Sequence, residues 1–488
     1  LGPYLVADLK SGRLTDEEAY RYIHSLWTMI ENRRTTVNGR IIVGGKGRKH
    51  PKEADVFLHI AMKVAKNCRY VEPQFTLRFD KETSEEIWDE ALDALGAGAT
   101  YPTLYNDDVN VPAVMYGMRV DEKTAEQYVP FGCTEFVIQG QSTGTPNICI
   151  NLLKLLTIYM NDAIDPIDGK RKSGPVSLKK LEEYQTFEEF YDGYKALLDY
   201  YLDLSVKAQY HSYEVMNQHV SFLFTSLLTD DCIARGKALL DGGVRYLGGT
   251  NETYGNINTS DSLWVIRDLV FNQKKYTLRQ LNDAMLANFN GYEALRKDCL
   301  NCDKYGNDLE TADTMANDLY EFVAKGVRDR GIAIGMQYFL IVISNNQLNT
   351  EWGNRTAASP DGRLSCMYMN PANNPQGGAN KSGPTAMLNS LAKFDAKYHG
   401  GSVQNIKFSP SMFNENRAVI KSLFKTYFAK GGCHLMVTVV DKGVLEDAVE
   451  HPENYPDLIV RVSGFSAVFV DLSPNIQQEL LSRVLYDE

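Results

Sequence analysis

The sequence has no long apolar run, few cysteines and no excess of basic residues. Its longest apolar stretch, residues 332–343, contains Gln337 and is shorter than the about 18 residues of a membrane-spanning helix, so no membrane partner is expected. Eight cysteines in 488 residues are too sparse for a disulfide scaffold and indicate reduced thiols of a cytoplasmic protein. The formal net charge of −11 argues against nucleic acid as a partner.

The composition is that of an ordinary globular protein, with 44% hydrophobic and 23% charged residues. A capping box, Thr15-Asp-Glu-Glu18, opens a helical pattern. Long helices are predicted over residues 187–207, 220–240, 315–328 and 384–394, and β-like runs over 41–43, 75–79, 435–440, 458–462 and 465–470. Strands that alternate with helices predict an α/β protein with a largely parallel sheet.

A single glycine separates the last two β-like runs. The segment reads Arg461-Val-Ser-Gly464-Phe465 and continues to Asp471. On spacing alone, a bulge or tight turn is the commoner interpretation, because glycine tolerates a positive φ and interrupts strand pairing.

A cysteine in the first third of the chain has a carboxylate two residues after it, in Pro130-Phe-Gly-Cys133-Thr-Glu135. The segment lies between a Pro-Gly turn and a polar, Gly-rich stretch, residues 139–144. Taken alone, it fits a buried cysteine that behaves as a small hydrophobic residue, with Glu135 in solvent.

Together the two segments resemble the glycyl radical enzymes, the superfamily of pyruvate formate-lyase, the choline and diol lyases, hydroxyproline dehydratase and the arylacetate decarboxylases. Residues 461–465 resemble its radical-loop signature, and 24 residues follow Gly464. Residues 355–363 and 381–385 are similar to two further family segments. The resemblance implies a ten-stranded α/β barrel over residues 1–430, which carries the cysteine loop, and a glycyl radical domain over 431–488.

The resemblance implies that Gly464 stores an unpaired electron and that Cys133 relays it to the substrate. A backbone radical is held best at a Cα without a side chain, where the neighbouring N and C=O delocalise it in a planar arrangement. The radical would be the only cofactor, with no bound metal. A radical S-adenosylmethionine activating enzyme would install it. The other expected partners are a small-molecule substrate and a second copy of the chain in a homodimer.

Glu135 indicates the reaction type. The Cys-x-Glu pattern resembles the lyases and dehydratases, in which the carboxylate acts as general base on a hydroxyl beside the substrate radical, worth about 10²–10⁴ in rate. We predict radical C–O (or other C–X) cleavage of a small polar substrate. Decarboxylation stays open, because arylacetate decarboxylases also carry Cys-x-Glu. Acyl transfer of the formate-lyase type is disfavoured, since Cys133 has no second cysteine beside it. A non-catalytic fragment or subunit is the third alternative.

Five further polar residues are predicted to bind the substrate: Tyr105, Asp107, Asp108, Asn251 and His434. The competing interpretation is turn capping for the Asn and Asp side chains and a buried core residue for His434.

The segment before the cysteine loop is short for this family. Members normally carry several hundred residues there, whereas 132 precede Cys133, and the chain begins Leu-Gly-Pro. We therefore expect a fragment or an unusually short member, in which part of the barrel wall is absent.

Overall fold

Two open sheets form the centre of the protein. The computed structural model describes residues 1–34, 39–144, 148–344 and 347–487. The first sheet has the order β1-β2-β3-β11-β10. Neighbours β1, β2 and β3 are parallel, β11 is antiparallel to β3, and β10 is parallel to β11. Its strands are β1 (Arg40–Gly44), β2 (Gln74–Phe79), β3 (Thr103–Asn106), β10 (Asn405–Phe408) and β11 (His434–Val439).

The second sheet has the order β6-β7-β8-β9, and all its neighbouring strands are parallel. These strands are β6 (Ile148–Asn151), β7 (Gly248–Tyr254), β8 (Tyr338–Ile343) and β9 (His399–Ser402). The link between β9 and β10 joins the sheets, because the Val403 N–H donates to Ile343 at 3.0 Å and the Met436 N–H donates to Gln404 at 2.8 Å. The predicted α/β class is confirmed. The residues described place five and four strands in these sheets, so the ten-strand count stays a prediction.

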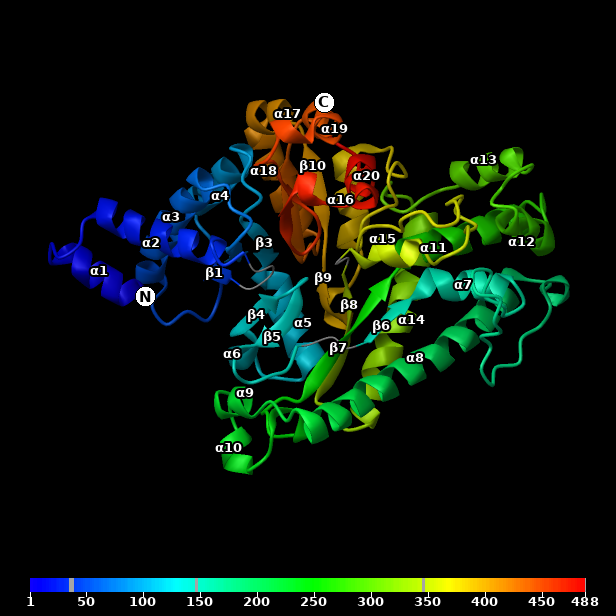
Figure 1. Ribbon diagram of the computed structural model, residues 1–488, viewed down its shortest axis with the longest axis horizontal. Helices are drawn as coiled ribbons and strands as arrows, with labels where there is room; N and C mark the ends of the chain where they lie inside the picture. Colours follow the sequence, from blue (N-terminus) through cyan, green and yellow to red (C-terminus); the bar gives the residue numbers. More distant parts are fainter. Residues whose placement is uncertain (35–38, 145–147, 345–346, 488) are drawn as a thin grey trace.

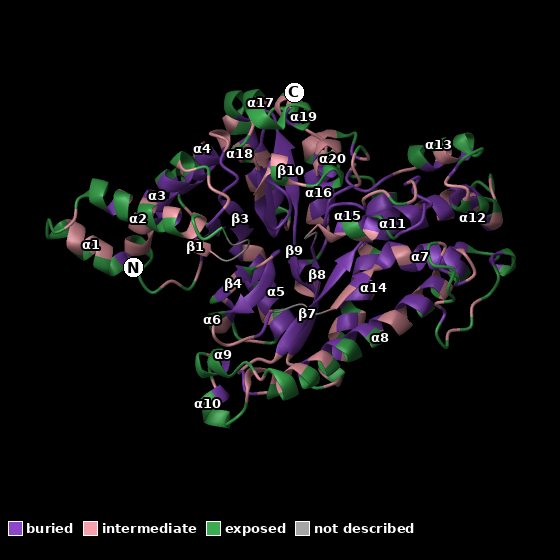
Figure 2. Ribbon diagram, viewed as in Figure 1, coloured by how far each residue is buried: buried purple, intermediate pink, exposed green. Residues whose placement is uncertain are grey.

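Helices cover the outer faces of the sheets (Figure 1). One layer packs beside β1 and β2, and a second packs around β7 and β8. Figure 2 shows that most of the central strands are buried, whereas many outer helical faces are exposed. The first layer is α1 (Gly2–Lys10), α2 (Asp16–Glu31), α3 (Pro51–Asn67) and α4 (Glu85–Gly96); the second is α7 (Leu152–Met160), α8 (Phe187–His219), α11 (Asn256–Val265) and α14 (Glu310–Ala333).

The remaining helices are connections and outer elements. They are α5 (Asp107–Met118), α6 (Glu122–Ala125), α9 (Leu223–Leu227), α10 (Cys232–Arg235), α12 (Leu278–Leu286), α13 (Glu293–Asn301), α15 (Leu348–Gly353), α16 (Gly383–Ala392), α17 (Pro410–Glu415), α18 (Arg417–Ala429), α19 (Lys442–Glu450) and α20 (Pro474–Ser482). No helix among the described residues combines the length and the apolar character needed to cross a membrane.

Local sequence signals explain most helix boundaries. The Thr15 capping box is present at the start of α2, and α8, α14 and α16 include most of three predicted helices. The long helix predicted over 220–240 is wrong. Phe222 and Asp231 adopt left-handed conformations at the starts of α9 and α10, and Gly236 ends α10 in the same way. The chain therefore turns at Asp231 instead of continuing as one helix.

Two small antiparallel hairpins complete the fold and position the site. One is β4 (Tyr128–Phe131) with β5 (Glu135–Ile138), and the other is β12 (Ile459–Arg461) with β13 (Ser466–Val468). The predicted boundary at 430/431 would assign β11 to the C-terminal unit, although β11 hydrogen-bonds to β3 and β10. That boundary stays a prediction.

Candidate active site

Cys133 occupies the tip of the β4–β5 hairpin. Phe131 pairs with Glu135, so three residues form the turn, and the Thr134 N–H donates to the Phe131 carbonyl at 3.0 Å. Gly132 has φ +49° and Thr134 has φ +93°. Left-handed φ is unusual for a β-branched residue, so the turn holds Thr134 in a strained conformation.

Gly464 occupies the tip of the β12–β13 hairpin. Arg461 pairs with Ser466, and the Val462 N–H donates to the Phe465 carbonyl at 3.0 Å. Gly464 is buried with φ +78°, a conformation that glycine adopts readily. The glycine between the two β-like runs is therefore a turn residue.

The two hairpin tips meet. A Cβ placed on Gly464 would lie 2.4 Å from Sγ of Cys133 and 3.0 Å from its Cβ. Because a bond from Cα is about 1.5 Å long, the sulfur lies within about 4 Å of the Gly464 Cα. It stands on the side where an L-residue would carry its side chain. Any larger residue at position 464 would overlap the thiol.

The environment of Cys133 keeps its thiol protonated. The residue is buried in a small apolar cluster with Ala372, Val403 and Met436. Burial, followed by the nearby carboxylates of Glu135 and Glu252, raises the pKa of Cys133 well above its usual range. An S–H bond therefore faces Gly464 at neutral pH.

Glu135 lies beside the same turn and is 3% exposed. A Cβ on Gly132 would be 2.7 Å from Oε2 of Glu135, so the carboxyl group packs against the peptide that precedes Cys133. This oxygen has no hydrogen-bond partner among the described residues. Burial, followed by the charge of Glu252, raises the pKa of Glu135 to about 8. The carboxyl group can therefore exchange a proton near neutral pH.

Glu252 is a site residue that the sequence analysis missed. Its Oε2 accepts hydrogen bonds from the Tyr254 hydroxyl at 2.5 Å and from the Cys149 thiol at 3.5 Å. The predicted residue next to it, Asn251, donates instead to Ser205 on α8, at 2.7 Å. Since successive side chains of a strand face opposite ways, Asn251 faces the covering helix and Glu252 faces the cysteine loop. The predicted substrate contact of Asn251 stays a prediction.

Two arginines near the hairpin tips were also missed. Arg40, on β1, donates to the Gly132 carbonyl at 2.7 Å. Arg461, on β12, is 1% exposed and donates from Nη1 to Ser466 at 3.2 Å, while its Nη2 has no partner among the described residues. Both positive charges act on Cys133 against the effects of burial and the carboxylates. In the sequence, Arg461 is notable only as part of the glycine signature.

Tyr105 and His434 face each other across the paired strands β3 and β11, with ring centroids 4.5 Å apart. The His434 Nδ1 accepts the Gln404 N–H at 3.3 Å. Burial, then the charges of Arg461 and Arg40, lower the pKa of His434 well below its usual range, so the ring is neutral. The Tyr105 hydroxyl is buried beside the Arg40 guanidinium. Substrate binding by this pair stays a prediction.

Asp107 and Asp108 are engaged by basic residues of the fold. The Arg78 guanidinium donates to both oxygens of the buried Asp107, at 2.9 and 2.7 Å, and the Tyr128 hydroxyl also donates to it, at 2.8 Å. Lys46 forms an ion pair with Asp108 at 2.7 Å. These contacts give both carboxylates a structural role, and their predicted substrate contacts stay untested.

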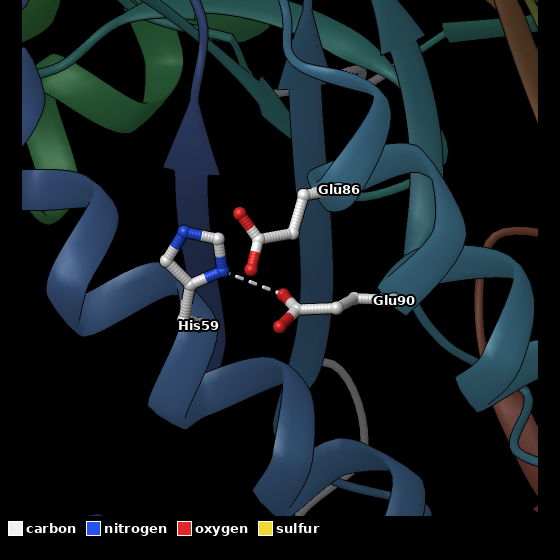
Figure 3. Close-up of side chains that lie close together, drawn as sticks. All are labelled: His59, Glu86 and Glu90. Carbon is white, nitrogen blue, oxygen red and sulfur yellow. Dashed lines mark hydrogen bonds and ion pairs between the residues drawn. The ribbon is translucent and has the colours of Figure 1, made fainter.

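A second group of titratable side chains lies between α3 and α4 (Figure 3). The His59 Nδ1 and the Glu90 carboxylate are 2.8 Å apart, and Glu86 lies one helical turn before Glu90. One ligand atom from each side chain lies within 4.8 Å of the others, which is close enough for a metal ion. The His59–Glu90 contact ties the two helices together. None of these residues comes from the two hairpins.

The two hairpin tips lie in regions that match two known protein families. Residues 1–348, which include Cys133, match the family described as pyruvate formate lyase-like, and residues 369–470, which include Gly464, match the glycine radical family. The chain belongs to the glycyl radical enzymes. The resemblance inferred from the two sequence segments is thus confirmed, and Cys133 and Gly464 lie in different matched regions of the glycyl radical enzyme.

Named relatives of this glycyl radical enzyme include dehydratases. It is 28% identical over 500 residues to the trans-4-hydroxy-L-proline dehydratase of Clostridioides difficile, covering 99% of this chain and 63% of the relative. It is 27% identical over 509 residues to the (2S)-3-sulfopropanediol dehydratase of Klebsiella oxytoca, covering 99% and 61%. The chain therefore spans about three-fifths of the length of these relatives.

Solved structures of the superfamily share the fold. The glycerol-bound B12-independent glycerol dehydratase of Clostridium butyricum superposes with a TM-score of 0.88 at 27% identity, covering 97% of this chain and 62% of that chain. Hydroxyproline dehydratase of Clostridioides difficile, with trans-4-hydroxy-L-proline bound, gives 0.91 at 25% identity, covering 100% and 63%. The α/β barrel fold of the glycyl radical enzymes therefore extends to this chain.

Proposed function

We propose that this chain carries the radical centre of a glycyl radical lyase of the dehydratase type. Gly464 stores the unpaired electron, Cys133 relays it, and Glu135 is the general base. The observation that carries the proposal is the contact of the hairpin tips, in which a Cβ at Gly464 would lie 2.4 Å from the Cys133 sulfur. A hydrogen atom can cross that gap without movement of either strand pair.

The relay begins with transfer of the Cys133 thiol hydrogen to the Gly464 radical. This step restores an ordinary glycine and leaves a thiyl radical on Cys133. The thiyl radical removes a hydrogen atom from a substrate carbon that bears a hydroxyl group. The S–H bond is formed again, and the unpaired electron now resides on the substrate carbon.

Glu135 then removes the proton of that hydroxyl group. The resulting ketyl-type radical anion expels hydroxide from the adjacent carbon, so one C–O bond breaks heterolytically and a C=O bond forms. Hydroxide takes the proton back from Glu135 and leaves as water. The product radical takes the hydrogen atom from Cys133, which regenerates the thiyl radical and then the Gly464 radical. A carboxyl group with a pKa of about 8 suits both the proton removal and the proton return.

The named relatives support this reaction type and leave the substrate open. They include dehydratases, isethionate sulfite-lyases and the glycyl radical subunit of a 4-hydroxyphenylacetate decarboxylase. Activation requires removal of a hydrogen atom from Gly464, and we assign it to a radical S-adenosylmethionine enzyme. The predicted homodimer and cytoplasmic location belong to the same proposal.

Electron paramagnetic resonance after anoxic activation tests the radical. We expect a doublet from the one hydrogen left on Cα, which collapses to a singlet in protein labelled with deuterated glycine. Glycerol, 1,2-propanediol and trans-4-hydroxy-L-proline are then screened for dehydration, and 4-hydroxyphenylacetate for release of carbon dioxide. Carbon dioxide without dehydration would replace the dehydratase assignment by a decarboxylase.

Cys133→Ser tests the relay. We expect the glycyl radical to form and turnover to be lost, because a hydroxyl O–H bond is too strong for reversible exchange with a glycyl radical. The matched control is Cys366→Ser, since Cys366 is an exposed free cysteine and should keep both signals. Turnover that survives the loss of Cys133 would refute its role.

A further inference from the structure

Arg40 holds a positive charge beside the reactive pair. It begins β1 and is half-buried. Its guanidinium donates to the Gly132 carbonyl at 2.7 Å, to the Thr76 hydroxyl at 3.3 Å and to the Gln74 side-chain carbonyl. The first contact fixes it against the peptide that immediately precedes Cys133.

The partners of the Arg40 side chain in the described structure are neutral. A carbonyl, an amide and a hydroxyl orient the guanidinium but do not compensate its charge. A guanidinium has five N–H donors in a planar fork that matches the oxygens of an anion. These contacts use three of the five N–H groups, and the Tyr105 hydroxyl lies beside the same guanidinium, so at most two N–H groups stay free for a ligand.

The charged groups around Arg40 also favour binding of an anion. Arg461 acts on the same residues as Arg40, is 1% exposed, and has an unpartnered Nη2. Glu252 contributes one negative charge to the same site, against the two positive charges of the guanidinium groups. Glu135 is largely protonated at neutral pH, because its pKa is about 8. A partly desolvated site with two guanidinium groups favours a negatively charged ligand.

Given the proposed function, we propose that Arg40 binds the anionic group of the substrate, a short hydroxylated carboxylate or sulfonate. The Glu135 carboxyl group packs against the same Gly132 peptide that Arg40 binds. A ligand that reaches from Arg40 to Glu135 therefore passes Cys133 within a few carbon atoms. Its anionic group lies on the guanidinium, its hydroxyl group lies at Glu135, and the carbon that loses hydrogen lies at the thiol.

The comparisons leave this choice open, because the named ligands of the relatives include both glycerol, which is neutral, and sulfopropanediol, which is an anion. Arg40 is the feature of this chain that favours an anionic ligand. The proposal thus gives a role in substrate specificity to Arg40, which lies on β1, outside both hairpins.

Equilibrium binding to the unactivated protein tests the assignment. The probes are glycerol, glycerate and 2,3-dihydroxypropane-1-sulfonate, which share a vicinal diol and differ in the third group. Calorimetry of the wild-type chain should give at least about tenfold tighter binding of one or both anions than of glycerol, as expected for charge-assisted hydrogen bonding to a partly buried guanidinium. The carboxylate and sulfonate arms distinguish the two anion classes.

Arg40→Gln removes the charge and keeps an amide donor for the neighbouring carbonyl. We expect it to abolish the preference for the anion while binding of glycerol changes less than about twofold. Arg21→Gln is the matched control, because Arg21 is an exposed residue of α2 whose loss changes the net charge equally. It should leave all three affinities unchanged.

Several results would overturn the assignment. They are binding of glycerol as tight as that of both anions, no binding of any probe, or an equal loss for all probes in Arg40→Gln. The wild-type comparison is decisive even where Arg40→Gln does not fold. Because no radical is needed, failure to detect a glycyl radical would refute the proposed function and leave this binding result standing.

Discussion

Replacement of Gly464 by alanine tests the contact on which the site depends. The new Cβ would meet Sγ of Cys133 at 2.4 Å, its Cβ at 3.0 Å and its Cα at 3.1 Å. The far end of a cysteine side chain can rotate, but the Cβ and Cα belong to the hairpin and cannot move without displacing it. We therefore expect Gly464→Ala to destabilise the folded chain.

The expected loss has two parts. A left-handed φ of +78° costs an alanine about 1–2 kcal/mol relative to glycine. Insertion of a methyl group into a filled site costs about 1–3 kcal/mol more. Together they predict that the free energy of unfolding falls by about 2–5 kcal/mol.

Gly378 provides a matched control for the backbone part. It has φ +79°, and a Cβ there meets nothing within 4 Å. Gly378→Ala should therefore lose only the about 1–2 kcal/mol of the backbone term. The difference between the two variants measures the contact with the cysteine loop.

A double-mutant cycle with Cys133→Ala isolates the sulfur itself. Without Sγ, the alanine at 464 loses its worst overlap, so the double variant should be more stable than the sum of the single losses predicts, by at least about 0.5 kcal/mol. Urea unfolding under reducing, anoxic conditions supplies the four values. If Gly464→Ala costs no more than Gly378→Ala, or if the coupling energy is zero, the hairpin tips do not touch and the relay has no path.

Two further predictions concern buried charges. Glu135→Gln removes a carboxyl group whose pKa is about 8 in the folded chain and about 4.3 when unfolded. The folded state holds that proton between these values, so wild-type stability should fall by up to about 5 kcal/mol as pH rises through this window. Urea unfolding near pH 5 and near pH 9 should show a smaller fall in the variant, and an identical fall would contradict the buried position of Glu135. Asp107→Asn leaves the buried Arg78 without its anion and should cost about 3–5 kcal/mol. The control is Glu446→Gln, which breaks the exposed ion pair with Lys442 and should cost about 0.5 kcal/mol or less. If thermal unfolding shows the same loss of stability for Asp107→Asn and Glu446→Gln, the structural role of Asp107 is refuted.

The sequence predicts the parts of the site that depend on local geometry. The glycine between two β-like runs predicts a bulge or tight turn at Gly464, and Pro130 with Gly132 predicts a turn before Cys133. The contact between the two turns cannot be predicted in this way, because Cys133 and Gly464 are 331 positions apart in the sequence. No local periodicity contains that information, and only the family resemblance supplied it.

Glu252 shows why the sequence does not tell which of two neighbouring strand residues faces the cysteine loop. Every residue of β7 is buried, so the strand has no polar face to reveal which side chains point inward. From the sequence alone, Asn251 and Glu252 are equally plausible as the residue that faces the cysteine loop. The position of α8 on one face of the sheet decides between them. The contact that holds Asp107 is non-local too, since its partner Arg78 lies on β2, 29 positions earlier. In both cases the decisive contact is non-local.

The ionisation of the site distinguishes radical transfer from ionic chemistry. A cysteine that acts as an ionic nucleophile needs a thiolate, and its surroundings lower its pKa. Around Cys133, burial and two carboxylates outweigh Arg40 and Arg461 and raise the pKa instead. Hydrogen-atom exchange needs an intact S–H bond close to the glycine carbon, and this environment preserves that bond. The electrostatics therefore favour hydrogen-atom exchange at Cys133 over ionic attack by a thiolate.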